Sequence, residues 1–390
     1  MNKRLVLIAC FLTVFISYAI RYGYGVLLPE MLVSLDITKA EAGVIYSSFF
    51  IAYTLSSPFL GLLGDRFNAR WLLSLFVAIL GLGAFLMSRS SSITQASLFY
   101  MLAGVGSSAC WAPVMALAQR WTSNTNKGKT LAIIDIGSAL GIIGSSAIVP
   151  IIVIAQSWRS GWVFLGTLGF IIAVFNLLVI KNRPPEALKI NTAEQKKREP
   201  AKTTFINLFI DTRFWLIGLA YLLTGFSIII PFTFLSTYAV QELDFSYKVA
   251  TNLLTVIGIG AIVSKLVFGS LSDKIGRIKV MMLCAAFIAI GSLGMVFSRS
   301  IALFIVTAIF SLGYGVVWAM YAAAASDYFS RESVGTTVGL WTVFLGIGSV
   351  ISPIISGWMA DTTGTLTWSF ALASAAALVS LLLLIPVWKS

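Results

Sequence analysis

The sequence contains no histidine, few cysteines and few charged residues. Charged residues make up 11% of the 390 positions, against 58% hydrophobic residues. Without histidine, the chain lacks the usual proton shuttle and the commonest metal ligand. Cys10, Cys110 and Cys284 all lie in apolar runs, which is typical of small buried residues and not of a disulfide framework or a metal cluster. We therefore expect no metal and no cofactor. A soluble domain carries about a quarter charged residues, so ordinary soluble classes are excluded.

Long apolar runs take the place of charge. A membrane-spanning helix needs ~20 predominantly apolar residues, and the chain has twelve such runs. The first run follows Met1-Asn2-Lys3-Arg4 without a small-residue cleavage site, so we interpret it as a helix and not as a signal peptide. The expected spans are about 5–29, 39–63, 71–88, 94–119, 130–155, 161–180, 214–240, 247–270, 278–297, 301–325, 334–359 and 367–387.

The net charge of +12 is unevenly placed. With the N-terminus inside, most of the loop cations fall on the inner side, which predicts that both termini are cytosolic. Residues 181–213 include Pro184, Pro185 and the run Glu194–Glu199, and we interpret them as a basic cytosolic linker. We expect the partners to be the lipid bilayer and a small molecule, with no nucleic acid, and a monomer in the plasma (inner) membrane.

A short polar turn occurs twice. Gly269 and Asp273 each lie 208 positions after Gly61 and Asp65, and cations follow in both copies. A shared offset of about half the chain predicts two repeats in parallel orientation. The fold class is therefore an all-α membrane protein of twelve helices in two six-helix pseudo-symmetric halves, 1–180 and 214–390. The predicted switch-loop residues are Gly61, Asp65, Arg66, Arg70, Gly269, Asp273, Lys274 and Arg277.

This turn resembles the signature loop of the major facilitator superfamily. The second copy matches fully, whereas Asn68 and Ala69 depart from the pattern in the first. The stretches 24–30 and 357–364 are similar to the monocarboxylate and oxalate/formate porter branch. The resemblance implies alternating access around a central cavity lined by the first, fourth, seventh and tenth helices. The second, fifth, eighth and eleventh helices flank that cavity and meet across the halves.

Three ionisable residues lie inside predicted spans: Arg21, Asp135 and Lys265. Each costs about 2.5–3.5 kcal/mol near a helix centre on insertion scales, which makes it a candidate for function. Two cations against one carboxylate favour an anionic substrate, with Arg21 as its anchor. Asp135 and Lys265 lie at similar depth, roughly 6–12 Å from the cytosolic end, and are predicted to pair when that side closes. The alternatives are snorkelling for the cations and a favourable early-helix position for Asp135.

Aromatic residues provide a predicted pocket wall. Tyr314, Trp318 and Tyr321 share one face of the tenth helix, and Trp111 stands beside the kinking Pro113. Plain packing is the alternative for such stripes. The predicted substrate-binding set is Arg21, Tyr22, Tyr24, Trp111, Lys265, Tyr314, Trp318 and Tyr321, with Asp135 and Lys265 as the coupling or gate residues.

The predicted function is secondary active transport of a small organic anion, a monocarboxylate in the first instance, coupled to protons or by exchange. Efflux of amphipathic drugs and uptake of a neutral solute stay open as alternatives. An enzyme is not expected, because the sequence has no His-Glu-x-x-His motif, paired intramembrane Asp or nucleotide loop. A non-transporting sensor is not expected either, since it would need an appended soluble domain.

Overall fold

The computed structural model describes residues 3–122, 127–181, 208–330 and 333–389, with the backbone alone described for 61–66 and 127. All the regular structure in these residues is helical, and twelve segments are long and apolar enough to cross a membrane. The helices are α1 (Lys3–Leu35), α2 (Lys39–Arg66), α3 (Ala69–Met87), α4 (Ile93–Ser107), α5 (Ala112–Arg120), α6 (Lys127–Ala155), α7 (Trp158–Val179), α9 (Thr212–Gln241), α10 (Tyr247–Ile275), α11 (Arg277–Phe297), α12 (Ile301–Tyr314), α13 (Val317–Tyr328), α14 (Val334–Thr363) and α15 (Thr367–Lys389). The predicted spans are confirmed within a few residues, except that the first helix continues through Pro29 to Leu35.

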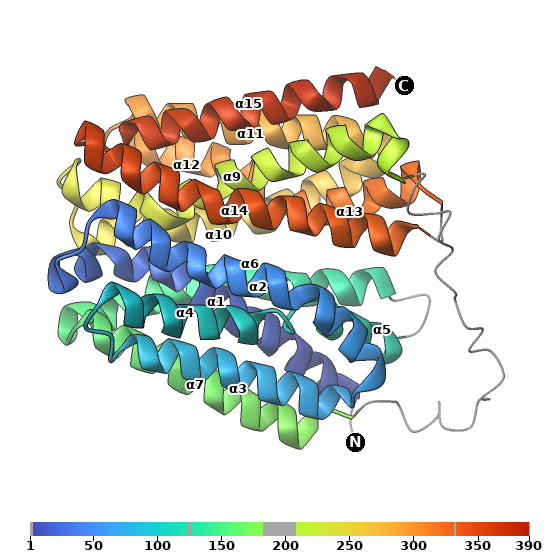
Figure 1. The fold of residues 1–390 in the computed structure, drawn as a ribbon, viewed down its shortest axis with the longest axis horizontal. Helices are drawn as coiled ribbons and strands as arrows, with labels where there is room; N and C mark the ends of the chain where they lie inside the picture. The colour runs from blue at the N-terminus through green and yellow to red at the C-terminus, as the bar shows by residue number, and fades with distance from the viewer. Residues whose placement is uncertain (1–2, 123–126, 182–207, 331–332, 390) are drawn as a thin grey trace.

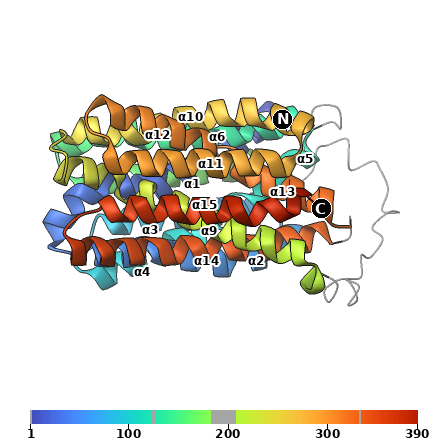
Figure 2. The same cartoon turned by 90° about the horizontal axis from the view of Figure 1, so that it is seen from above.

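Figure 1 shows α1–α7 gathered in one group and α9–α15 in the other, with both chain termini at the same end of the bundle. We call this end the terminal end and the opposite one the distal end. Figure 2, turned by 90°, shows the helices running between these two ends. The predicted linker 181–213 lies mostly outside the described residues, so the boundary between the halves stays a prediction.

Local signals set several helix starts. The side chains of Asn68, Ser92, Ser157 and Asp211 each accept a hydrogen bond from a backbone N–H in the first turn of α3, α4, α7 and α9. Asn68, which departs from the family's second glycine, thus acts as a helix cap. The second copy keeps Gly276, whose φ of 95° favours glycine at the turn between α10 and α11.

Two spans are broken near the middle. The fourth divides into α4 and α5 just before Pro113, and the tenth divides into α12 and α13 at Gly315. Pro113 explains the first break, because proline cannot continue the hydrogen-bond ladder. At the second break, a Cβ on Gly315 would collide with the backbone of Ala261 on α10. Broken helices at membrane depth are tolerated where they line a cavity, so the breaks indicate where to look for a site.

Candidate functional site

A large cavity, with a volume of about 910 Å³, lies between the two groups of helices. Its wall includes residues from both broken spans, among them Trp111 and Trp318. Gln119, one residue before the end of α5, and Gly335, near the start of α14, also line it. Both of these residues lie at the terminal end, so the cavity extends toward that end.

The distal end is closed by direct contacts between the two groups. The Tyr247 hydroxyl donates a hydrogen bond to the Val26 carbonyl at 2.8 Å, and the Ser47 hydroxyl donates to the Val350 carbonyl at 2.6 Å. The backbones of α1 and α9 are also in close contact, because a Cβ on Gly25 would overlap a carbonyl of α9. The molecule is therefore in a state closed at the distal end.

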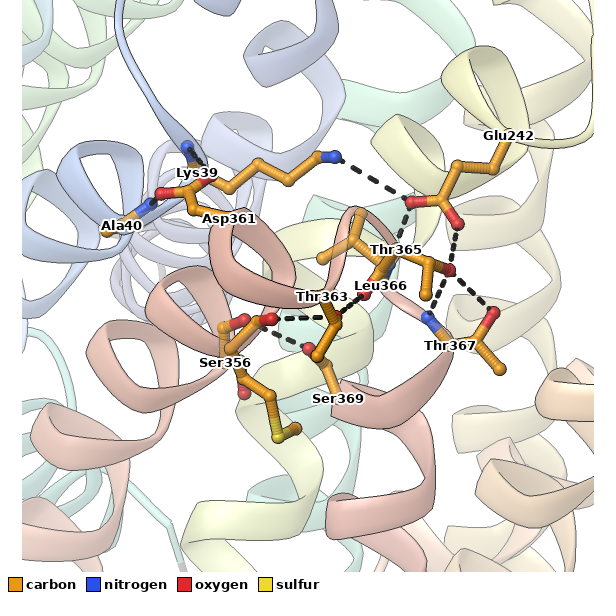
Figure 3. A network of polar contacts seen from close by, with 11 residues as sticks. Lys39, Ala40, Glu242, Ser356, Asp361, Thr363, Thr365, Leu366, Thr367 and Ser369 are labelled. Atoms are coloured by element: carbon orange, nitrogen blue, oxygen red, sulfur yellow. Dashed lines mark hydrogen bonds and ion pairs between the residues drawn. The ribbon is translucent and has the colours of Figure 1, made fainter.

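A polar network reinforces this closure, and we call Lys39, Ala40, Glu242 and Asp361 the distal latch (Figure 3). Asp361 on α14 accepts hydrogen bonds from the backbone N–H groups of Lys39 and Ala40, at 3.0 and 2.8 Å. These are the first two amides of α2, so a carboxylate from one group of helices caps a helix of the other. Glu242 accepts from the backbone N–H of Leu366 at 2.8 Å and lies 3.8 Å from the Lys39 ammonium.

Arg21 is a buried cation, with 4% of its surface exposed. Its Nη2 donates a hydrogen bond to the Ser107 hydroxyl at 3.1 Å, and its Nε has no hydrogen-bond partner in the described part of the chain. Aromatic rings surround the guanidinium carbon, with the ring centroids of Tyr53 and Tyr18 at 4.5 and 4.9 Å. Such cation–π contacts are worth roughly 0.5–2 kcal/mol each, which offsets part of the cost of burial. No carboxylate of the described residues forms an ion pair with Arg21.

Arg21 does not line the large cavity directly. It lines an adjoining cavity of about 20 Å³, together with Tyr22. That volume is room for about one water molecule. Tyr53 and Trp318 line both cavities and so form a partition between Arg21 and the larger space.

Asp135 and Lys265 meet across the α6–α10 contact. The Lys265 ammonium lies 2.8 Å from Oδ1 of Asp135, 2.9 Å from the main-chain oxygen of Asp135 and 2.7 Å from the Ser138 hydroxyl. An ammonium has three N–H donors, and these three acceptors occupy all of them. The pair lines the large cavity and is formed while that cavity extends toward the terminal end. The sequence predicted that Asp135 and Lys265 pair when the cytosolic side is closed. Here they pair while the cavity extends toward the terminal end, so closure of that end is not needed for the ion pair.

The aromatic predictions divide into two groups. Trp111, Tyr314, Trp318 and Tyr321 all line the large cavity, and Tyr22 lines the small one. Tyr24 instead packs in a buried aromatic cluster, with its hydroxyl donating to the Ala42 carbonyl at 2.8 Å. Among the described residues that line the two cavities Tyr24 is absent, so its assignment to the substrate site is not supported by this geometry.

The second switch loop is held by ion pairs. The Arg277 guanidinium lies 2.7 Å from Asp273 and 3.8 Å from Asp327 on α13. Lys274 is in the last turn of α10. In the first copy, Arg70 donates its backbone N–H to Asn68 at 3.0 Å. The side chains of Asp65 and Arg66, and the surroundings of Gly61, lie outside the described residues.

Several polar residues of the site escaped the sequence reading. Ser107 and Ser138 contact the two cations, yet isolated hydroxyls inside apolar runs carry little signal. Asp361 lies in the stretch 357–364, which carried a family resemblance but gave no sign of its contact with α2. The capping box Thr38-x-x-Glu41, whose two bonds are 2.8 and 3.2 Å, was a usable signal for the start of α2.

Comparison with known proteins gives the same architecture. The model of the Major Facilitator Superfamily matches residues 10–263 and 218–389. A hexuronate transporter of Bacillus subtilis is 25% identical over 98% of this chain and 94% of its own length. The membrane sensor protein UhpC of Escherichia coli is 24% identical over 96% and 90%, and monocarboxylate transporter 12-B of Danio rerio is 23% identical over 98% and 86%. A crystal structure of a mutant of the nucleoside transporter NupG covers 98% of this chain and 100% of its own, with a TM-score of 0.83 at 15% identity.

Proposed function

The chain belongs to the major facilitator superfamily of membrane transporters, and on that premise we propose that it carries a small organic anion across the membrane by alternating access. It is a transporter and not an enzyme. The observation that carries the proposal is Arg21, a buried guanidinium without an ion pair among the described residues, next to a cavity large enough for a small organic molecule. A buried charge of this kind is costly unless a partner neutralises it, and a substrate carboxylate is such a partner.

A carboxylate fits the donors around Arg21. A guanidinium binds a carboxylate bidentately. The Nε of Arg21 and the hydroxyl of Tyr22 are both buried, with no hydrogen-bond partner among the residues that the structure describes. The tenth-span aromatics, with Tyr314 and Trp318 at 5.3 Å between ring centroids, offer a wall for the apolar part of the substrate. The relatives named for hexuronate and monocarboxylate transport both handle organic acids. We take a monocarboxylate as the first candidate.

The switchable elements of the cycle are the latch, the Asp135–Lys265 pair and the two switch loops. Exchange of Asp135 for water or substrate as the partner of Lys265 would link anion binding to separation of α6 and α10. We propose that both termini lie in the cytosol, because the cations of the loops concentrate at the terminal end. A monomer in the plasma membrane remains part of the proposal. Coupling to protons and anion exchange both fit this scheme.

The test is uptake into proteoliposomes of labelled lactate, formate, oxalate, glucuronate and glucose. Anions should enter, saturably and in competition with one another, while glucose should not. Uptake of glucose without uptake of any anion would contradict anion transport and indicate transport of a neutral solute. The similarity to a protein named as a membrane sensor favours one second candidate, a receptor that binds the anion without moving it. Saturable binding of an anion to the purified protein, with no uptake, would support the receptor.

A further inference from the structure

We propose that Asp135 sets the charge of the anion that the cavity accepts, because it neutralises Lys265 and leaves Arg21 as the uncompensated cation of the site. This inference rests on the proposed function. It makes Asp135 a specificity-determining residue that acts through Lys265, in favour of monoanions over dianions.

The charges of the cavity walls give the first step. Among the described residues that line the two cavities, Arg21, Asp135 and Lys265 are the charged ones. Two cations and one carboxylate leave a single net positive charge. A substrate with one carboxylate cancels that charge, whereas a second carboxylate on the same substrate would enter the site without a cation to neutralise it.

The hydrogen bonds of Lys265 give the second step. All three of its N–H donors are used, two of them by Asp135 itself and one by Ser138. In this state Lys265 therefore has no N–H donor left for a substrate, and it binds one only after Asp135 or Ser138 releases it. With 14% of its side chain exposed, it borders the cavity, so loss of the Asp135 charge would present an uncompensated cation there.

The position of Tyr18 gives the third step. Tyr18 lines the large cavity together with Asp135 and Lys265, and its ring centroid is 4.9 Å from the guanidinium carbon of Arg21. Tyr18 therefore contacts the Arg21 guanidinium and lines the same cavity as the Asp135–Lys265 pair. A substrate that binds Arg21 and extends past Tyr18 into the large cavity therefore places a second carboxylate in the space that Asp135 and Lys265 line.

The experiment compares two acids of one skeleton, gluconate with one carboxylate and glucarate with two, and repeats the comparison with lactate and malonate. Each is used as a competitor of labelled anion uptake at pH 7, and as a ligand that raises the melting temperature of the purified protein. Wild type should favour the monoanion. Asp135→Asn should shift the preference toward the dianion by about tenfold, the effect expected of one additional cation in a partly hydrated site.

The double variant Asp135→Asn, Lys265→Gln separates charge from structure. It restores the single net positive charge while the ion pair is gone, so its preference should return to that of wild type. An unchanged preference in Asp135→Asn, or a double variant that keeps the preference of Asp135→Asn, would overturn the inference. The melting-temperature shift reports the preference even in a variant that has lost transport. If no anion binds to the wild-type protein and none is taken up by proteoliposomes that contain it, the proposed function is contradicted instead.

Discussion

Removal of the Asp361 charge should open the distal end. Asp361 accepts hydrogen bonds from the Lys39 and Ala40 amides at 3.0 and 2.8 Å, and it holds a negative charge at the positive end of the α2 dipole. The Asp361→Asn side chain would keep one oxygen as an acceptor for one of these two amides. It would lose the negative charge, and its NH2 group would face the other amide, where no hydrogen bond can form. A helix cap is worth ~0.5–2 kcal/mol and a charge at a helix terminus ~0.3–1 kcal/mol. The change should therefore weaken closure by about 1.4 kcal/mol, which is a tenfold shift in the equilibrium between closed and open distal ends.

The shift can be measured as a distance between spin labels at Val33→Cys and Ile301→Cys. These residues are 78% and 76% exposed and lie at the distal end, one in each group of helices. The native Cys10, Cys110 and Cys284 are buried, and serine replaces them in the labelling background. Asp361→Asn should increase the population with the longer distance about tenfold.

The matched control is Asp244→Asn, an exposed carboxylate at the same end that forms no hydrogen bond or ion pair of the kind Asp361 makes with α2 in the described residues. Asn also tolerates the positive φ of 56° at Asp244. This control should leave the distance distribution as in wild type. Identical distributions for Asp361→Asn and Asp244→Asn would refute the assignment of the latch.

Three further changes test other parts of the account. Trp318→Ala should open the partition and admit bulkier carboxylates, so the uptake of a large acid relative to a small one should rise. If a small polar thiol reagent never reaches a cysteine at this position, the placement of Trp318 in the cavity wall is contradicted. Asp135→Asn and Lys265→Gln, alone and combined, should show a coupling of about 1–3 kcal/mol in thiol-reagent access at the terminal end, and strictly additive effects would remove the pairing. Gly276→Ala should lower the free energy of unfolding by about 1–3 kcal/mol, and with it the melting temperature, because alanine is strained at a φ of 95°. Gly269→Ala is the control, since Gly269 lies in a helix and its new methyl group would have no described atom within 4 Å. Equal melting temperatures of the two variants would contradict the strain.

Most of the fold could be predicted from sequence, because apolar runs and helix caps are local signals. Pro113 also marked the break between α4 and α5. The break at Gly315 had no such mark, because its cause is the approach of Ala261, a residue more than fifty positions earlier. Prediction of the first helix stopped at Pro29, where the chain in fact continues helically to Leu35.

The site was predictable in its charges and less so in its contacts. Tyr22 and Tyr24 both stood beside Arg21 in sequence, but residues two apart on a helix point to different sides, so Tyr22 lines a cavity while Tyr24 packs in the core. The three acceptors that use all the N–H donors of Lys265 lie on α6, so the sequence of α10 alone could not predict them. The latch joins Asp361 to an amide 322 positions away, and such a contact has no sequence signature.

The measurement that tests the central claim most directly is anion uptake by Arg21 variants in proteoliposomes, with the transported anion identified from the substrate panel. Hydrogen bonds to charged groups are worth ~1.5–3 kcal/mol each, so loss of a bidentate contact should reduce kcat/KM more than a hundredfold in Arg21→Ala. Arg21→Lys should keep weak transport, since the charge remains without the planar fork. Arg213→Ala, which removes a half-exposed cation paired with Asp211 outside the cavities, is the control and should transport as wild type does. Normal uptake kinetics in Arg21→Ala, at equal expression and melting temperature, would contradict the account.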